Sequence, residues 1–290
     1  MKGSVLMPVL AAALGVAAFT LMDAMMKGLS IAIGVYNAML WRMLAGTLLG
    51  GALFIGTGAR RPSREAFRLH LLRSTVAVIV GYGFFWGIVR VPLAEGIAIT
   101  FIAPLVGLYL ARVMLGEEIV PRAVLGSLLG LAGVGTILAD KLRPGYDEQV
   151  LLGMASLLVS AFFYGFNLVL QRRQALLASP LEVAFFQSLL VFLMLALAAP
   201  FLAVAPEPGR LPELLGIAVL SLSAVALMSW AYGRAQAQIL LPVEYTGFVW
   251  AAVLGWLFFG EAITLAACAG TALIVAGCFM ASYRRRRAMA

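Results

Sequence analysis

Polar and aromatic side chains recur at intervals of four residues within long apolar stretches of this chain. The four sets are Phe19, Asp23 and Lys27; Tyr82, Trp86 and Arg90; Phe163, Asn167 and Gln171; and Trp230 with Arg234. Residues four apart lie on one face of a helix, so each set forms a stripe. A charged side chain is costly in a lipid environment and usually faces a cavity. The stripes therefore predict a shared polar lumen that binds a small solute.

Catalytic motifs do not accompany these stripes. The sequence contains no H-E-x-x-H, no G-x-S-x-G and no cysteine cluster. His70 is the one histidine, and Cys268 and Cys278 lie ten residues apart on the same apolar stretch, too far from each other to form a disulfide. We therefore expect a protein that is not an enzyme and that carries neither a metal nor a cofactor.

The composition places the chain in a lipid bilayer. Hydrophobic residues make up 63%, charged residues 12%, and the mean hydropathy is +1.02, far from the usual globular mixture. Since about 20 apolar residues span a membrane as a helix, ten spans are predicted. They cover about 5–29, 35–57, 69–90, 93–115, 120–140, 149–171, 181–204, 211–235, 239–259 and 262–283. The expected fold is an all-α polytopic membrane protein.

The second half of the chain repeats the first. Adding 144 to a position takes Trp86 to Trp230, Arg90 to Arg234 and Glu117 to Glu261 without a gap. The predicted units are 1–145 and 146–290, with five helices each. Because five is odd, the second unit enters the membrane from the opposite side, which makes an inverted repeat around a central cavity. This architecture is typical of secondary transporters.

Positive charge predicts the orientation. If the N-terminus is cytoplasmic, the inner segments carry most of the basic residues, whereas Lys27, Arg90, Lys141, Arg143 and Arg210 lie outside. We expect both termini to be cytoplasmic and the net charge of +8 to reflect this topology. Arg284–Arg287 then serves as a stop-transfer anchor, and no nucleic-acid partner is expected.

Several motifs resemble those of a known family. Trp41-Arg42 in the second span, Phe186-Gln187 in the seventh, and Pro104 followed by Gly116-Glu117 resemble the EamA branch of the drug/metabolite transporter superfamily. The resemblance covers nearly the whole chain. It implies that spans 1, 3, 4, 6, 8 and 9 line a central cavity. The most similar members in our interpretation are inner-membrane exporters of aromatic and other neutral amino acids in bacteria.

The chain also departs from the family pattern. Glu118 stands where many members have arginine, and Phe248 occupies the position that corresponds to Pro104 in the first half.

We assign the stripes to a cavity and two gates. The cavity candidates are Phe19, Asp23, Tyr82, Trp86, Phe101, Phe163, Asn167, Trp230 and Tyr245. The gating or coupling candidates are Lys27, Arg90, Gln171, Arg234 and Glu244. Glu244 follows Pro242 at a predicted helix start, where it stabilises the helix N-terminus or takes part in coupling. Alternating access of a small neutral solute, with aromatic or hydrophobic amino acids preferred, is the expected mechanism.

Other interpretations stay open. Trp86 and Trp230 also fit interfacial belt residues, Asp23 and Lys27 also fit a local ion pair, and Arg42 fits a structural partner within the bundle better than a ligand contact. A passive channel, or an exporter of drugs, sugars or lipid-linked metabolites, would share the fold. A monomer already contains both halves of a lumen, and a dimer through Gly126 and Gly130 remains an alternative.

Overall fold

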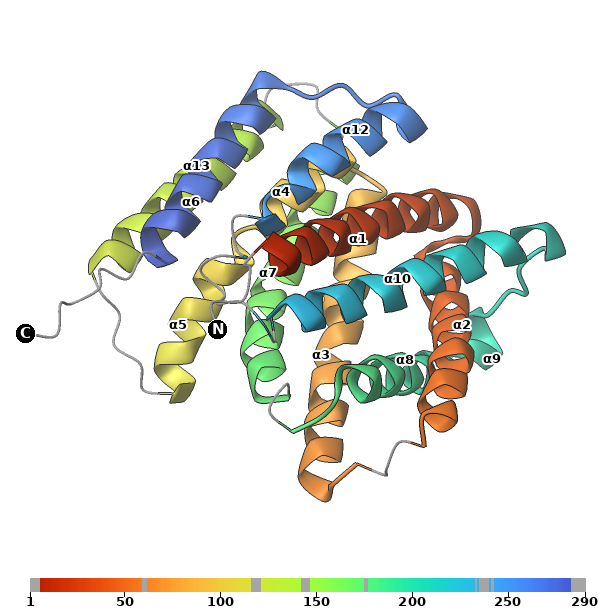
Figure 1. The fold of residues 1–290 in the computed structure, drawn as a ribbon. Helices are drawn as coiled ribbons and strands as arrows, with labels where there is room; N and C mark the ends of the chain where they lie inside the picture. The colour runs from red at the N-terminus through yellow and green to blue at the C-terminus, as the bar shows by residue number, and fades with distance from the viewer. Residues whose placement is uncertain are drawn as a thin grey trace, which may run out of the picture.

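The computed structural model describes residues 6–58, 62–115, 121–141, 147–174, 177–232, 234, 240 and 243–282. Within them the chain is helical (Figure 1), and the predicted all-α fold is confirmed. The helices of the first half are α1 (Leu6–Ile33), α2 (Val35–Gly56), α3 (Arg64–Ile88), α4 (Leu93–Thr100), α5 (Ala103–Leu115) and α6 (Pro121–Lys141). Those of the second half are α7 (Glu148–Gln174), α8 (Pro180–Ala196), α9 (Ala199–Leu202), α10 (Leu211–Tyr232), α12 (Gly247–Phe259) and α13 (Leu265–Ser282), with a 3-10 turn at Pro208–Arg210.

Length and hydropathy fit a polytopic membrane protein. Five described segments are long and apolar enough to cross a bilayer: Leu6–Ile33, Val35–Gly56, Arg64–Ile88, Glu148–Gln171 and Pro208–Met228. Shorter apolar helices of 10–17 residues account for the other predicted spans. Large apolar side chains such as Leu14, Leu48 and Trp256 are exposed, as expected of a surface that faces lipid tails rather than water.

Local sequence signals explain where the helices begin and turn. Ser63 and Ser179 accept hydrogen bonds from the backbone N–H groups of Ala66 and Glu182, and so cap α3 and α8. Gly34 has a φ of 82°, in the left-handed region that glycine adopts without strain, and lets α2 follow α1 directly.

The fourth predicted span is not one helix. It is interrupted at Phe101 and Ile102, where the amide groups bond three residues back to Ala98 and Ile99 at 3.1 and 3.3 Å. Pro104, at the second position of α5, has no N–H to continue the ladder. The ninth predicted span is likewise interrupted: Val243 and Glu244 are helical, a turn follows at Tyr245 and Thr246, and α12 begins at Gly247.

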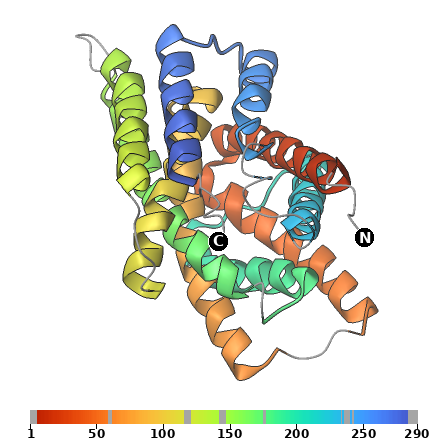
Figure 2. The same cartoon turned by 60° about the vertical axis from the view of Figure 1, so that its left-hand side comes forward.

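The helices pair in a way that respects the repeat. The most extensive contacts join α6 to α13, α3 to α7, α1 to α10, and α2 to α8. The offset of 144 positions relates α1 to α7, α2 to α8, α3 to α10 and α6 to α13. It therefore turns the α3–α7 pair into the α1–α10 pair, and it leaves the α2–α8 and α6–α13 pairs unchanged. In Figures 1 and 2 the α6–α13 pair stands at one edge of the molecule, and α1 lies along α10.

Glycines let α6 and α13 approach closely. A methyl group added to Gly133 would overlap the carbonyl oxygen of Gly270, and one added to Gly277 would overlap that of Gly126. The two contacts are equivalent in the two halves of the chain, because Gly126 corresponds to Gly270 and Gly133 to Gly277. The glycine face predicted between Gly126 and Gly130 therefore packs within the chain, which leaves less of it for a dimer.

Candidate functional site

A charged pair lies at the centre of the bundle. Asp23 of α1 and Arg42 of α2 are close enough for their charges to interact. The Arg42 guanidinium also donates to Ser221 Oγ of α10 at 3.3 Å and lies 5.7 Å from the ring centroid of Phe85 in α3. Arg42 thus interacts with residues of three other helices, and Asp23 interacts electrostatically with Arg42.

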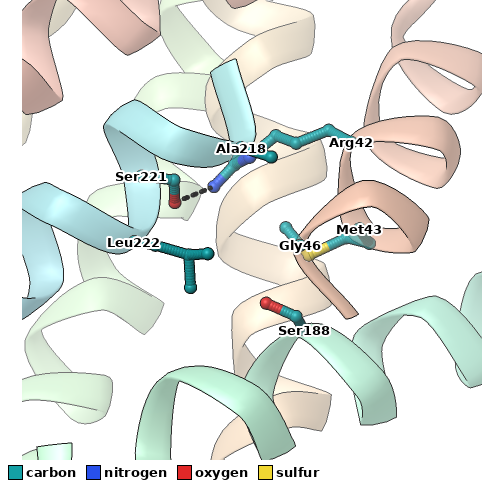
Figure 3. A pocket seen from close by; sticks show the side chains of 7 residues that line it. All are labelled: Arg42, Met43, Gly46, Ser188, Ala218, Ser221 and Leu222. Carbon is teal, nitrogen blue, oxygen red and sulfur yellow. Dashed lines mark hydrogen bonds between the residues drawn. The ribbon is translucent and has the colours of Figure 1, made fainter. Parts of the chain in front are cut away.

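A small pocket opens beside Arg42. Its lining comes from α2, α8 and α10 and consists of Arg42, Met43, Gly46, Ser188, Ala218, Ser221 and Leu222. Figure 3 shows the Arg42 side chain reaching across this pocket to Ser221, with the Ser188 hydroxyl turned toward Gly46. The pocket therefore offers a cation and two hydroxyl groups within an apolar frame.

Tyr164 of α7 extends the polar centre. Its phenol interacts electrostatically with Glu244, Arg73 and Asp23, which lie on three other segments of the chain. Tyr164 is 37% exposed. The resulting polar centre, formed by Asp23, Arg42, Arg73, Tyr164 and Glu244, holds two acidic and two basic groups.

Arg73 was not among the predicted cavity residues. It is buried in α3, and its Nε donates to Asn167 Oδ1 of α7 at 2.9 Å. Its Nη1 donates to Gln174 Oε1, about two helical turns further along α7. In the sequence Arg73 resembles an ordinary topology-setting arginine near His70, and only its partners on α7 distinguish it.

Lys27 of α1 contacts residues next to α4 and α12. Its Nζ donates to the backbone oxygen of Val91 at 2.7 Å and forms an ion pair with Glu261. The second oxygen of Glu261 accepts from the backbone N–H of Leu93 at 2.7 Å, at the start of α4. The Lys27 junction, as we name Lys27, Val91, Leu93 and Glu261, thus ties α1 to both halves of the chain.

This arrangement changes the interpretation of two residues. Lys27 is 3% exposed and contacts Glu261 rather than forming a local pair with Asp23. Glu261, which the sequence analysis identifies only as the repeat counterpart of Glu117, is its partner 234 positions away. The repeat counterpart of Glu261 is Glu117, which lies outside the described residues.

The two tryptophan–arginine stripes are built alike. Arg90 stacks on Trp86 at 3.5 Å from the ring centroid, and Arg234 stacks on Trp230 at 4.2 Å. Each guanidinium also donates to the backbone oxygen of its own tryptophan, at 2.9 and 3.3 Å. Arg90 further donates to Gln149 at the start of α7.

Several residues of the predicted stripes are exposed. Tyr82 is 42% exposed and Trp230 39%, whereas Phe85 and Ile88 on α3 are buried. Gln171 and Arg234 are exposed as well. Among the remaining candidates, Phe19 packs against the main apolar core and Phe163 lies edge-on to Phe162 at 5.8 Å.

The two helix interruptions meet. Phe101 and Tyr245 are in edge-to-face contact, with centroids 5.1 Å apart and planes at 80°. Tyr245 also contacts Phe279 of α13 at 5.7 Å. The two predicted cavity aromatics thus lie against each other where α4–α5 and the segment before α12 cross.

Apolar spanning helices around a charge-balanced polar centre are the features of a multi-pass membrane protein. No group of three or more His, Cys, Asp or Glu that could hold a metal occurs among the described residues. The model of the EamA-like transporter family matches residues 6–139 and 151–283. The chain belongs to this family, as the sequence motifs predicted.

Curated relatives are transporters. The chain is 27% identical over 286 residues to the pseudopaline exporter CntI of Pseudomonas aeruginosa (strain UCBPP-PA14), covering 99% of this chain and 98% of that protein. It is 24% identical over 243 residues to a riboflavin transporter of Brucella anthropi, covering 81% and 83% of the two chains. Another protein, known from a crystal structure, shares the fold of this chain. The TM-score is 0.62, the sequence identity is 22%, and the match covers 97% of each chain.

Proposed function

We propose that this protein is a secondary transporter that exports small zwitterionic metabolites across a bacterial inner membrane by alternating access. Neutral amino acids with aromatic or hydrophobic side chains are the first candidate cargo. Two inverted repeats, 1–145 and 146–290, would each supply half of the pathway, and one chain would suffice. Both termini would be cytoplasmic.

The polar centre carries this proposal. The acids Asp23 and Glu244 and the base Arg73 interact electrostatically with Tyr164, and Arg42 interacts with Asp23. An ammonium and a carboxylate on one small molecule would match this balanced set, whereas a multiply charged anion would leave the two acids opposed. The aromatic contact of Phe101 with Tyr245 supplies an apolar surface for a planar side chain.

The Lys27 junction supports alternating access. Its ion pair and its two hydrogen bonds to backbone groups that flank Pro92 hold α1 against the start of α4. A carrier needs such a contact on one side at a time, because both ends must never open together. We infer that this structure is closed at the Lys27 end.

The functions of the relatives widen the range of cargo. One relative is an exporter of pseudopaline and another is a transporter of riboflavin. The sequence identities to these relatives are 27% and 24%, so their cargo does not transfer directly to this chain. We therefore include related small metabolites in the cargo class, and we test zwitterionic amino acids first.

Counterflow in proteoliposomes tests the proposal. Vesicles are loaded with unlabelled phenylalanine, tryptophan, methionine or threonine, and entry of the same labelled compound is followed. We expect transient accumulation of at least one of them above equilibrium, which a passive channel does not produce. If no amino acid shows counterflow while riboflavin or a sugar does, the cargo assignment is wrong. Movement of labelled lipid between leaflets would instead indicate a flippase.

A further inference from the structure

A buried chain of hydrogen bonds links α3, α7 and α8 at one end of the bundle. From Arg73 Nη1 it passes to Gln174 Oε1, from Gln174 Nε2 to His70 Nδ1 at 2.6 Å, and from His70 Nε2 to Glu182 Oε1 at 3.1 Å. His70, Arg73 and Gln174 are 1%, 8% and 2% exposed. We name Arg73, Gln174, His70 and Glu182 the His70 network; the mechanism proposed above leaves His70 without a role.

Chemistry fixes the direction of every bond in this network. Arginine only donates, so the atom of Gln174 that faces Arg73 is its carbonyl oxygen. The amide nitrogen of Gln174 then faces His70 and donates, which leaves Nδ1 of His70 as the acceptor. The proton of the neutral ring therefore sits on Nε2 and is donated to the Glu182 carboxylate.

Protonation of His70 conflicts with this arrangement. An imidazolium carries a proton on both nitrogens, so Nδ1–H would point at the N–H of Gln174. Turning the Gln174 amide would relieve that contact, but it would bring the amide nitrogen against the Arg73 guanidinium. A proton on His70 and the Gln174–Arg73 hydrogen bond are therefore mutually exclusive.

The charges around His70 lead to the same conclusion. In the described part of the chain, the charged groups that the network brings to His70 are Glu182 of α8 and, through Gln174 of α7, Arg73 of its own helix. The ring face is covered by Phe186 of α8, stacked at 5.0 Å and 18°. With neutral His70 the two charges balance, and one more proton leaves a net positive charge in a buried site.

We propose that His70 is a proton-binding site coupled to cargo through Gln174 and Arg73. Histidine is the side chain that changes charge between roughly pH 5 and 8. Uptake of a proton turns Gln174 away from Arg73, and the freed Nη1 becomes available to an acidic group of the cargo. Because coupling between two ligands is reciprocal, bound cargo in turn raises the proton affinity of His70. The cargo step rests on the proposed function, whereas the proton site itself does not.

A single histidine makes the site directly observable. After removal of any affinity tag, the chain labelled with 15N and 13C histidine gives one imidazole signal set by NMR in lipid nanodiscs. We expect the Nε2–H tautomer at neutral pH and a reversible change to the imidazolium at lower pH. An Nδ1–H tautomer, or a ring that never titrates between roughly pH 5 and 8, would overturn the proposal.

Two substitutions should move the titration in opposite directions. Gln174→Glu places a carboxylate that accepts from both Arg73 and an Nδ1–H of His70, so the midpoint pH rises by about one unit or more. Glu182→Gln removes the negative charge at Nε2, so the midpoint falls. Glu65→Gln changes an exposed acid on α3 and serves as the matched control with no shift. Equal midpoints in all three variants would contradict the network.

Transport then tests the coupling. Counterflow of the wild-type carrier should become faster at subsaturating cargo as the pH falls, and His70→Asn, which cannot titrate, should lose most of this dependence. An unchanged pH dependence in His70→Asn would overturn the coupling. If the NMR shifts appear as expected but no tested cargo shows counterflow, the proton site stands and the proposed function fails.

Discussion

Phe101 and Tyr245 are equivalent residues of the two repeats, 144 positions apart, and they touch each other edge-to-face at 5.1 Å. Two equivalent residues contact each other only if they lie beside the axis that relates the halves. Each also marks the interruption of its own helix, between α4 and α5 and just before α12. The axis of the repeat therefore passes through the two broken helices, where a carrier built from inverted repeats exposes backbone groups to its cargo.

The Phe101–Tyr245 contact should be important for transport. Tyr245→Ala removes the ring and an edge-to-face contact worth about 1 kcal/mol, so we expect counterflow to slow by roughly fivefold or more with normal insertion. Tyr245→Phe keeps the ring and is the matched control, expected to retain most of the rate. Initial rates of counterflow at equal protein content measure both. A Tyr245→Ala carrier as fast as the wild type would remove these rings from the pathway.

The Lys27 junction predicts a second effect. Lys27→Met leaves the Glu261 carboxylate without its cation, which for a buried pair costs about 3 kcal/mol. We expect the closed end to open more often and counterflow to fall. The exchanged pair Lys27→Glu with Glu261→Lys tests the ion pair separately, because it restores opposite charges but not the hydrogen bonds to Val91 and Leu93.

Accessibility provides the measurement for the Lys27 junction. Leu29, buried in α1 two residues beyond Lys27, is replaced by cysteine after both native cysteines have been changed to serine. Its rate of labelling by a membrane-impermeant maleimide should rise in Lys27→Met and return toward the wild-type rate in the exchanged pair. Equal labelling in all three proteins would mean that the junction does not close this end.

Much of the architecture follows from sequence because it depends on local or repeated patterns. Apolar length and the constant offset of 144 predict the spans and their duplication, and Pro104 accounts for the break before α5. The Lys27–Glu261 and Arg73–Asn167 contacts are different. They join residues 234 and 94 positions apart, and they depend on which helices pack together, which no single helical stripe determines.

Arg42 and Asp23 should act as a unit. Asp23→Asn leaves the Arg42 charge uncompensated at the centre, and Arg42→Gln does the same to Asp23, so each substitution should lower counterflow by about tenfold or more. The double variant carries no net charge change and should be less impaired than the product of the two single effects predicts. Counterflow rates of the four proteins, wild type included, give the coupling. Strict additivity would show that the two residues act separately.

The close packing of α6 on α13 predicts a difference between two neighbouring glycines. Gly133→Ala would press its methyl group against Gly270 and Ile274, so we expect the protein to lose about 1–3 kcal/mol of stability. Gly135 lies two residues further along the same helix, and a methyl group added there would meet no neighbour within 4 Å. Gly135→Ala should therefore be neutral or stabilising by about 0.5–1 kcal/mol, because alanine favours a helix more than glycine does.

Thermal unfolding of the Gly133→Ala and Gly135→Ala variants in the same detergent measures this contrast. Because the two substitutions add the same methyl group to the same helix, a difference between them reports the space around each glycine rather than helix propensity. Similar melting temperatures would mean that α6 and α13 are less tightly packed than the structure shows, whereas a lower value for Gly133→Ala alone would confirm the contact.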